Sequence, residues 1–226
     1  MIATKANLTF SLKVVHSPGM PPSKIKEEPY TWEEIVAIVK NNQLEKFARS
    51  AAQTESYHSF KAALKDAHTS VFKFLLVNQL HWYEPKHNNS IPIDQINELE
   101  DHEIKIVAAS DKLFGHESDV KILPNHFPYY FPSDVSHLCV WSKTRIQNDP
   151  HSPYGDISPK TRQEIDAYVR RTFVENLGID PSNICWFRNW EALQSVKSIS
   201  HIHVIVKGLT EEQKAKVLYG PGSIEA

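Results

Sequence analysis

Two histidines separated by a single residue lie near the C-terminal end of the chain, in a segment that alternates as a β-strand does. His201, His203 and Ile205 fall on one face of this segment, and the positions between them are branched aliphatic residues. Two imidazoles on one strand face lie close together and point the same way, which suits phosphate or metal chemistry. The simpler alternative is an exposed strand face that happens to carry two histidines. The segments upstream decide between these interpretations.

Bulk composition indicates an ordinary globular protein of 226 residues, enough for one substantial α+β domain. The formal charge of -2 and the pI of about 6.6 predict no nucleic-acid partner. Neither a signal peptide nor an apolar run near 18 residues is found, so we expect no membrane association and a cytoplasmic location. Cys139 and Cys185 lie in apolar runs and are interpreted as small buried residues.

The elements that must position the histidines begin with a helical portion over residues 30–100. It follows a proline-containing arm or linker, residues 1–29, in which residues 8–14 alternate as a short strand would. Thr31 and Glu34 form a capping-box pattern that opens a first helix. Further helical segments are predicted over residues 43–52 and 60–80, with apolar stripes interpreted as helix packing.

From residue 101 the pattern changes to strands, with helices predicted after Ser158 and Thr210. Because helices come first and strands later, the order favours an α+β fold with an antiparallel sheet. We expect residues 101–226 to form one compact unit with residues 30–100. The predicted strands cover residues 104–107, 119–123, 135–141, 184–187 and 200–206.

Three segments together resemble the histidine-triad superfamily, including its galactose-1-phosphate uridylyltransferase branch. Residues 125–129 read Asn-His-Phe-Pro-Tyr, and residues 136–143 form a strand pattern with a leading histidine and a trailing lysine. Residues 187–203 contain Phe-Arg-Asn, Gln-Ser-Val and His-Ile-His in that order. The resemblance covers residues 101–208 and implies an antiparallel histidine-triad-like sheet with the N-terminal helical portion added to it.

The resemblance also implies a chemistry, in which the middle histidine attacks the α-phosphorus of a nucleotide substrate. By position that residue is His203, and His201 orients its neighbour or hydrogen-bonds to the backbone. A neutral imidazole can attack phosphorus when an acceptor holds its other nitrogen. We add Arg188 as a basic phosphate contact beside the implied asparagine. The ligand-binding residues are then Asn125, Phe127, Pro128, His137, Arg188, Asn189, Gln194 and Ser195.

Two departures from the family pattern bear on turnover. Ile205 stands where the superfamily has a histidine or a glutamine that contacts the phosphates. The spacing from Ser195 to His201 is also longer than in the family motif. Because loss of one oriented donor costs about 100- to 1,000-fold in rate, either change favours binding over rapid turnover.

Two other chemistries fit less well. A metal site on His201 and His203 would need His137 or His126 as a third ligand, and no Cys or Glu motif at metal-ligand spacing supports it. A two-histidine phosphoesterase would need Ser or Thr two positions after each strand histidine, where Cys139 and His203 stand instead. We therefore expect neither a metal nor a cofactor.

At the level of the whole chain, residues 31–44, 125–141 and 194–204 resemble a fungal family of N-acetylglucosamine-induced proteins. The expected function is binding of a nucleotide or nucleotide-sugar phosphate, with hydrolysis or nucleotidyl transfer through a histidine nucleophile as the candidate reaction. The alternative is a non-catalytic ligand-sensing or interaction protein of an amino-sugar response that retains the fold. A homodimer is left open.

Overall fold

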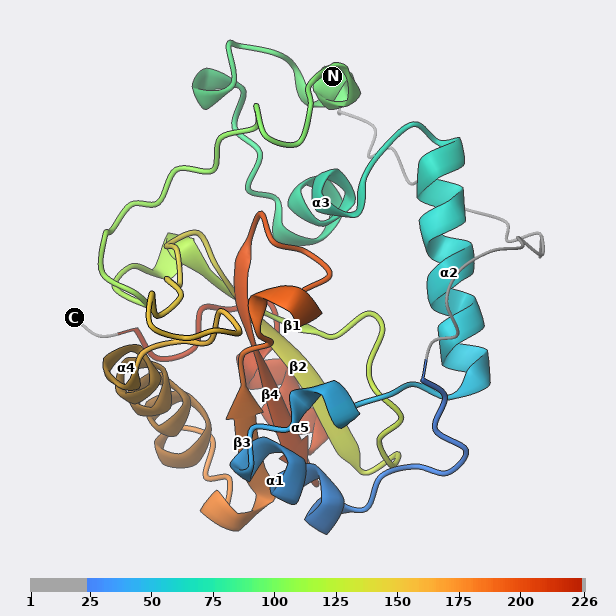
Figure 1. Cartoon of the computed structure of the whole chain (residues 1–226). Coiled ribbons are helices and arrows are strands. Elements are labelled where there is room, and N and C mark those ends of the chain that lie inside the picture. Colours follow the sequence, from blue (N-terminus) through green and yellow to red (C-terminus); the bar gives the residue numbers. More distant parts are fainter. Residues whose placement is uncertain (1–23, 225–226) are drawn as a thin grey trace.

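A four-stranded antiparallel sheet forms the centre of the computed structural model, which describes residues 24–224 (Figure 1). The strand order is β1-β2-β4-β3, and every neighbouring pair is antiparallel. This arrangement of helices and antiparallel strands confirms the predicted α+β class. The strands are β1 (Val120–Pro124), β2 (Val135–Ser142), β3 (Ile184–Phe187) and β4 (Ser200–Lys207).

Helices lie before, between and after the strands. A capping box opens α1 as predicted, because the Thr31 hydroxyl accepts the Glu34 N–H at 3.2 Å and the Glu34 carboxylate accepts the Thr31 N–H at 2.8 Å. The α-helices are α1 (Trp32–Lys40), α2 (Ala51–Asp66), α3 (Val71–Phe74), α4 (Pro159–Val169) and α5 (Glu211–Val217). Wider π-type turns extend α3 over Leu75–Leu80 and α4 over Arg170–Glu175. Short 3-10 turns occupy Leu44–Lys46, Pro85–His87, Ile93–Glu98, Glu117–Asp119, Pro181–Asn183 and Glu191–Leu193.

One face of the sheet, which we call the back face, is filled with apolar side chains. Ile202, Val204 and Val206 of β4 point to it, and all three are fully buried. Ile165 of α4 and Val217 of α5 belong to the same cluster. The alternation of β4 therefore produces a continuous hydrophobic core on this side.

The opposite face, which we call the front face, is covered at its two ends by separate apolar clusters. At one end Ile205 packs with Ile35 of α1. At the other end Cys139 and Trp141 of β2 pack with Leu76, which follows α3. Figure 1 shows α1 and α3 near opposite ends of the sheet. The strand histidines lie between these clusters.

Three predictions about the elements are wrong. The helix predicted over residues 43–52 is a 3-10 turn at Leu44–Lys46 followed by non-helical residues, and α2 begins only at Ala51. Ile104–Val107 forms no strand, because the Asn88 side chain accepts the Lys105 N–H at 2.7 Å and donates to the Lys105 carbonyl at 3.2 Å. A side chain thus satisfies backbone groups that a strand partner would otherwise satisfy. The predicted helix over residues 60–80 is two helices, interrupted where His68 takes a positive φ of 51°. The short strand predicted over residues 8–14 lies outside the described residues.

Candidate functional site

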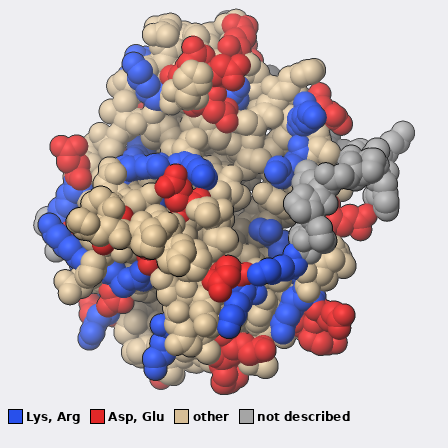
Figure 2. Space-filling view, viewed as in Figure 1, with Lys and Arg blue, Asp and Glu red and all other residues tan. Residues whose placement is uncertain are grey.

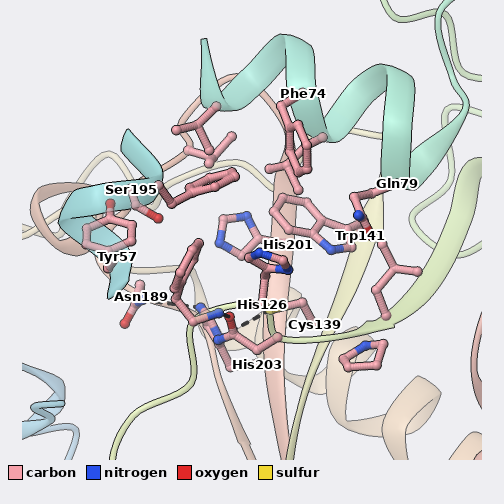
Figure 3. Close-up of a pocket in the computed structure, with 18 of the residues that line it drawn as sticks. Tyr57, Phe74, Gln79, His126, Cys139, Trp141, Asn189, Ser195, His201 and His203 are labelled. Carbon is pink, nitrogen blue, oxygen red and sulfur yellow. Dashed lines mark hydrogen bonds between the residues drawn. The ribbon is translucent and has the colours of Figure 1, made fainter. Parts of the chain in front are cut away.

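A cavity of about 280 Å³ opens on the front face between the sheet and the helical segments. Figure 3 shows Phe74 and Gln79, from the segment that begins with α3, facing Trp141 and His201 of the sheet. Tyr57 of α2 closes another side of the cavity. No Asp or Glu is among the described residues that line it. Over the molecular face in Figure 2, acidic and basic side chains are interspersed, so the absence of carboxylates is local to the cavity.

Most of the residues singled out from the sequence meet in this cavity. Asn125 directly follows β1, and Asn189 comes two residues after β3, so both lie where strands end. The strand histidines come from the middle of β4. The predicted residues that line the cavity are Asn125, Phe127, Asn189, Ser195, His201 and His203.

Four predicted residues do not line the cavity. His137 lies behind His203 on the neighbouring strand β2, and the Gln194 amide donates to the Asn189 carbonyl at 2.8 Å. Arg188 is buried and points elsewhere, donating to the Gly155 carbonyl at 3.0 Å and to the Asn148 side chain at 2.6 Å. The predicted phosphate contact by Arg188 is therefore corrected, since its guanidinium is already engaged in a different part of the structure. Pro128 is the fourth of these residues.

A chain of hydrogen bonds determines which nitrogen of each imidazole carries the proton. The Phe127 N–H donates to Asn125 Oδ1 at 3.0 Å, so the Asn125 amide nitrogen faces His137 Nε2 at 3.1 Å. Because an amide nitrogen only donates, His137 Nε2 must accept. The same Nε2 lies 2.9 Å from His203 Nδ1, which therefore carries the proton and donates it. The remaining ring nitrogen of His203, Nε2, is left with a lone pair.

Asn189 contacts that lone pair. Its amide nitrogen lies 3.2 Å from His203 Nε2 and 3.4 Å from the Tyr129 hydroxyl. Its Oδ1 is buried and has no hydrogen-bond partner among the described residues. A buried acceptor without a donor costs free energy, so this atom is a position where a ligand hydroxyl or N–H would be stabilised.

His201 is held in a different way. Its Nδ1 lies 3.1 Å from the Ile199 carbonyl, so Nδ1 carries the proton and Nε2 keeps a lone pair. Its ring lies 4.4 Å from the Trp141 ring, centroid to centroid, at an angle of 34°. The two histidines of β4 thus each keep an unprotonated Nε2, one beside an indole and one beside an amide.

Burial keeps these imidazoles neutral. Desolvation lowers the pKa of His137 to about 3 and that of His201 to about 4. Desolvation also lowers the pKa of His203 well below its ordinary value. Electrostatic interactions with His137, His201 and Arg49, which would repel a proton on His203, act in the same direction. Burial raises the pKa of the Cys139 thiol, whose sulfur lies 3.6 Å from His203 Nδ1. A neutral ring with a free lone pair can act as a nucleophile or as a hydrogen-bond acceptor.

The sequence interpretation missed the contribution of the helical portion. Arg49, Tyr57, Phe60, Phe74 and Gln79 all line the cavity, although the apolar stripes of this region were expected only to pack helices together. No motif marks these residues, because their positions depend on how α2 and α3 are placed over the sheet.

The described residues contain no group of three or more His, Cys, Asp or Glu side chains that could hold a metal ion.

Comparison with known proteins places the chain in a family. The family model described as "Protein of unknown function (DUF3605)" matches residues 31–207. The chain belongs to that family. The match begins at the N-cap of α1 and ends with β4, so the helical segments over the front face and the whole sheet fall within the DUF3605 match.

Two fungal proteins are similar to this chain. N-acetylglucosamine-induced protein 1 of Candida albicans is 44% identical over 213 residues, which cover 93% of this chain and 82% of that protein. Uncharacterized protein YPL067C of Saccharomyces cerevisiae is 27% identical over 177 residues, 78% of each chain. The predicted resemblance to the N-acetylglucosamine-induced family is thereby confirmed.

A solved structure supports the fold. The crystal structure of HTC1 superposes with a TM-score of 0.59 at 26% identity, covering 82% of this chain and 91% of that one. Among the described residues, no helix is both long enough and apolar enough to cross a membrane.

Proposed function

We propose that the front-face cavity binds a small phosphorylated ligand of the nucleotide or nucleotide-sugar class, on the strand face that carries His201 and His203. The observation that supports this most is convergence: Asn125, Asn189, Ser195 and His203, from three separate segments, line one cavity. Side-chain amides and a hydroxyl are donors suited to phosphate oxygens. Among the described residues, none that lines the cavity is a carboxylate that would repel an anion.

The candidate reaction is attack by His203 at phosphorus, as in the histidine-triad enzymes that the sheet segments resemble. The Nε2 lone pair forms the N–P bond while the P–O bond to the leaving group breaks. His137 Nε2 accepts a hydrogen bond from the His203 Nδ1–H at 2.9 Å. This bond stabilises the positive charge that develops on the His203 ring. Water or an acceptor hydroxyl then attacks the phosphorus, giving hydrolysis or nucleotidyl transfer and freeing Nε2. Solvent supplies the proton that the leaving group requires and takes up the proton that the attacking water or hydroxyl loses.

A second function, binding without turnover, has its own support. Ile205, at the third position of the motif, is fully buried in the apolar cluster with α1 and offers no polar group to a ligand. The Asn189 amide also covers the His203 lone pair at 3.2 Å. A ligand sensor of an amino-sugar response would need the cavity but not the reaction. The name of the Candida albicans relative, which refers to induction by N-acetylglucosamine, is consistent with such a role.

The test mixes the full-length protein with nucleotides and UDP-sugars and follows thermal stability and product release. If the protein is an enzyme, product forms with wild-type protein and with the surface variant His151→Ala, and falls at least about 1,000-fold with His203→Ala. Stabilisation without product would support the sensor function. Product that survives His203→Ala would contradict the nucleophile, and the absence of any stabilisation would contradict both functions.

A further inference from the structure

We infer that Arg49, which directly precedes the N-cap of α2, is the anion-recognising residue of this cavity and that the ligand carries one phosphate group. This inference rests on the proposed function and narrows its ligand class. Arg49 comes from the helical portion, outside the segments that resemble the histidine-triad proteins.

The Arg49 guanidinium is fixed in place on one side and available on another. Its Nε and Nη2 donate to the Phe127 carbonyl at 3.1 and 3.0 Å. Its Cζ lies 4.6 Å from the centroid of the Tyr57 ring and 5.6 Å from that of Tyr129. Within residues 24–224 no carboxylate pairs with it, so the Nη1 hydrogens are available to a ligand. A guanidinium held in this way loses little side-chain freedom when it binds phosphate.

Arg49 lies on the side of the cavity where the reactive nitrogen lies. Tyr129 packs beside the guanidinium, and its hydroxyl is 3.4 Å from the Asn189 amide nitrogen. That nitrogen is in turn 3.2 Å from His203 Nε2. Tyr129 and Asn189 thus connect Arg49 to His203, and the Arg49 charge lies near enough to help lower the pKa of His203.

The charges in the cavity limit how much phosphate it can neutralise. Among the described lining residues Arg49 is the only Arg or Lys, and burial keeps His201 and His203 neutral. Arg188, the other basic candidate, donates to Gly155 and Asn148 instead. One guanidinium offsets most of the charge of one phosphate group, whereas a diphosphate would leave much more charge unneutralised in a partly desolvated site.

The shape of the cavity and the unpartnered acceptor Asn189 Oδ1 indicate the other features of the ligand. A cavity of about 280 Å³ lies just below the range for small-molecule sites, about 300 to 1,000 Å³, and so favours a small ligand. Phe60, Phe74 and Trp141 provide flat apolar walls for a ring. Asn189 Oδ1 has no donor among the described residues and awaits a hydroxyl or N–H. A nucleoside monophosphate or a sugar phosphate has all three features.

Binding is measured by calorimetry on the full-length protein with AMP, UMP and glucose 6-phosphate. The uncharged parents adenosine, uridine and glucose and the diphosphates ADP, UDP and UDP-glucose complete the set. The variants are Arg49→Met, which removes the charge, and Arg49→Lys, which keeps the charge without the planar fork. The matched control is Lys61→Met. Lys61 also lies beside the Tyr57 ring, 5.6 Å from its centroid, but it is exposed and does not line the cavity.

We expect AMP, UMP or glucose 6-phosphate to bind at least tenfold more tightly than the compound without phosphate (adenosine, uridine or glucose). We expect the same margin over the corresponding diphosphate (ADP, UDP or UDP-glucose). Arg49→Met should weaken that binding by about 10- to 100-fold, Arg49→Lys by less, and Lys61→Met by less than twofold. Wild-type affinity with no loss in Arg49→Met, or tighter binding of diphosphates, would overturn the inference while leaving the proposed function intact. The ligand ranking needs only wild-type protein, so it decides the case even if Arg49→Met does not fold. If no phosphorylated compound binds the wild type, the proposed function fails and the inference fails with it.

Discussion

The two faces of one sheet show how differently adjacent residues of a strand are used. On the back face, β4 contributes Ile202, Val204 and Val206 to an apolar core that is filled by α4 and α5. On the front face, the alternating residues are His201, His203 and Ile205, and of these three only Ile205 is packed in an apolar cluster. The histidines instead border a cavity of about 280 Å³.

The difference follows from what the side chains require. Aliphatic groups gain free energy by excluding water, so the back face closes completely. Imidazoles need hydrogen-bond partners when buried, and His137, Asn189 and the Ile199 carbonyl provide them. The helical portion closes over the two ends of the front face and leaves the polar middle open, so the same sheet forms a core on one side and borders a cavity on the other.

The largest predicted effect comes from placing a carboxylate on each side. Val204→Asp buries an unpaired charge in the back-face core and should cost more than about 4 kcal/mol of unfolding free energy, enough to prevent folding. Gln79→Glu puts the same group beside the cavity, where water can reach it, and should cost less than about 1 kcal/mol. Circular dichroism shows whether Val204→Asp folds at all, and urea unfolding measures the loss in each variant that does fold. Equal losses would mean that the two faces do not differ as described.

Much of this asymmetry was predictable from the sequence. The period of two in residues 200–206 assigned each side chain to a face, and Ile184–Phe187 was predicted as a strand with the bounds that the structure has. The segment Ile104–Val107 misled because its alternating apolar residues say nothing of the distant Asn88 side chain that binds its backbone. The local pattern thus predicted the strands whose backbone pairs with other strands. It failed for Ile104–Val107, where a side chain binds the backbone.

The site divides in the same way. Asn125, Asn189 and His203 carry a recognisable motif, because their positions are set by strands β1, β3 and β4 of one sheet. Arg49 has no such mark. Its place depends on the Phe127 carbonyl, 78 residues further along the chain, and on the stacking of Tyr57. Such a residue becomes visible only when the tertiary structure brings the helical portion over the sheet.

A smaller effect on the unfolding free energy is expected from pH, and it comes from the buried histidine His201 on the front face. The pKa of His201 is about 4 in the folded protein and about 6.5 when unfolded, so between these values the unfolded chain binds more protons. Stability is therefore complete above about pH 6.5 and falls as the pH drops toward 4, by about 2 kcal/mol at pH 5 from this residue. His201→Asn, which keeps a donor near the Ile199 carbonyl, should remove that part of the difference in unfolding free energy between pH 7 and pH 5.

Urea titrations at the two pH values measure this difference, and the exposed His151→Asn variant controls for loss of a surface histidine. An unchanged pH dependence in His201→Asn would mean that His201 takes up protons as readily in the folded protein as in the unfolded chain. The front face would then be far more hydrated than its burial indicates.

The smallest predicted effect compares the helices that cover the two faces. Capping boxes begin α1 on the front side and α5 on the back side, with Thr31 and Thr210 as their N-cap residues. Thr31→Ala and Thr210→Ala should each lower the unfolding free energy by about 1 kcal/mol, because each leaves a helix N–H without its acceptor. If the helical portion and the sheet unfold together, both variants shift one common transition in fluorescence and in circular dichroism. A separate early transition in Thr31→Ala alone would mean that α1 packs only loosely on the Ile205 end of the front face.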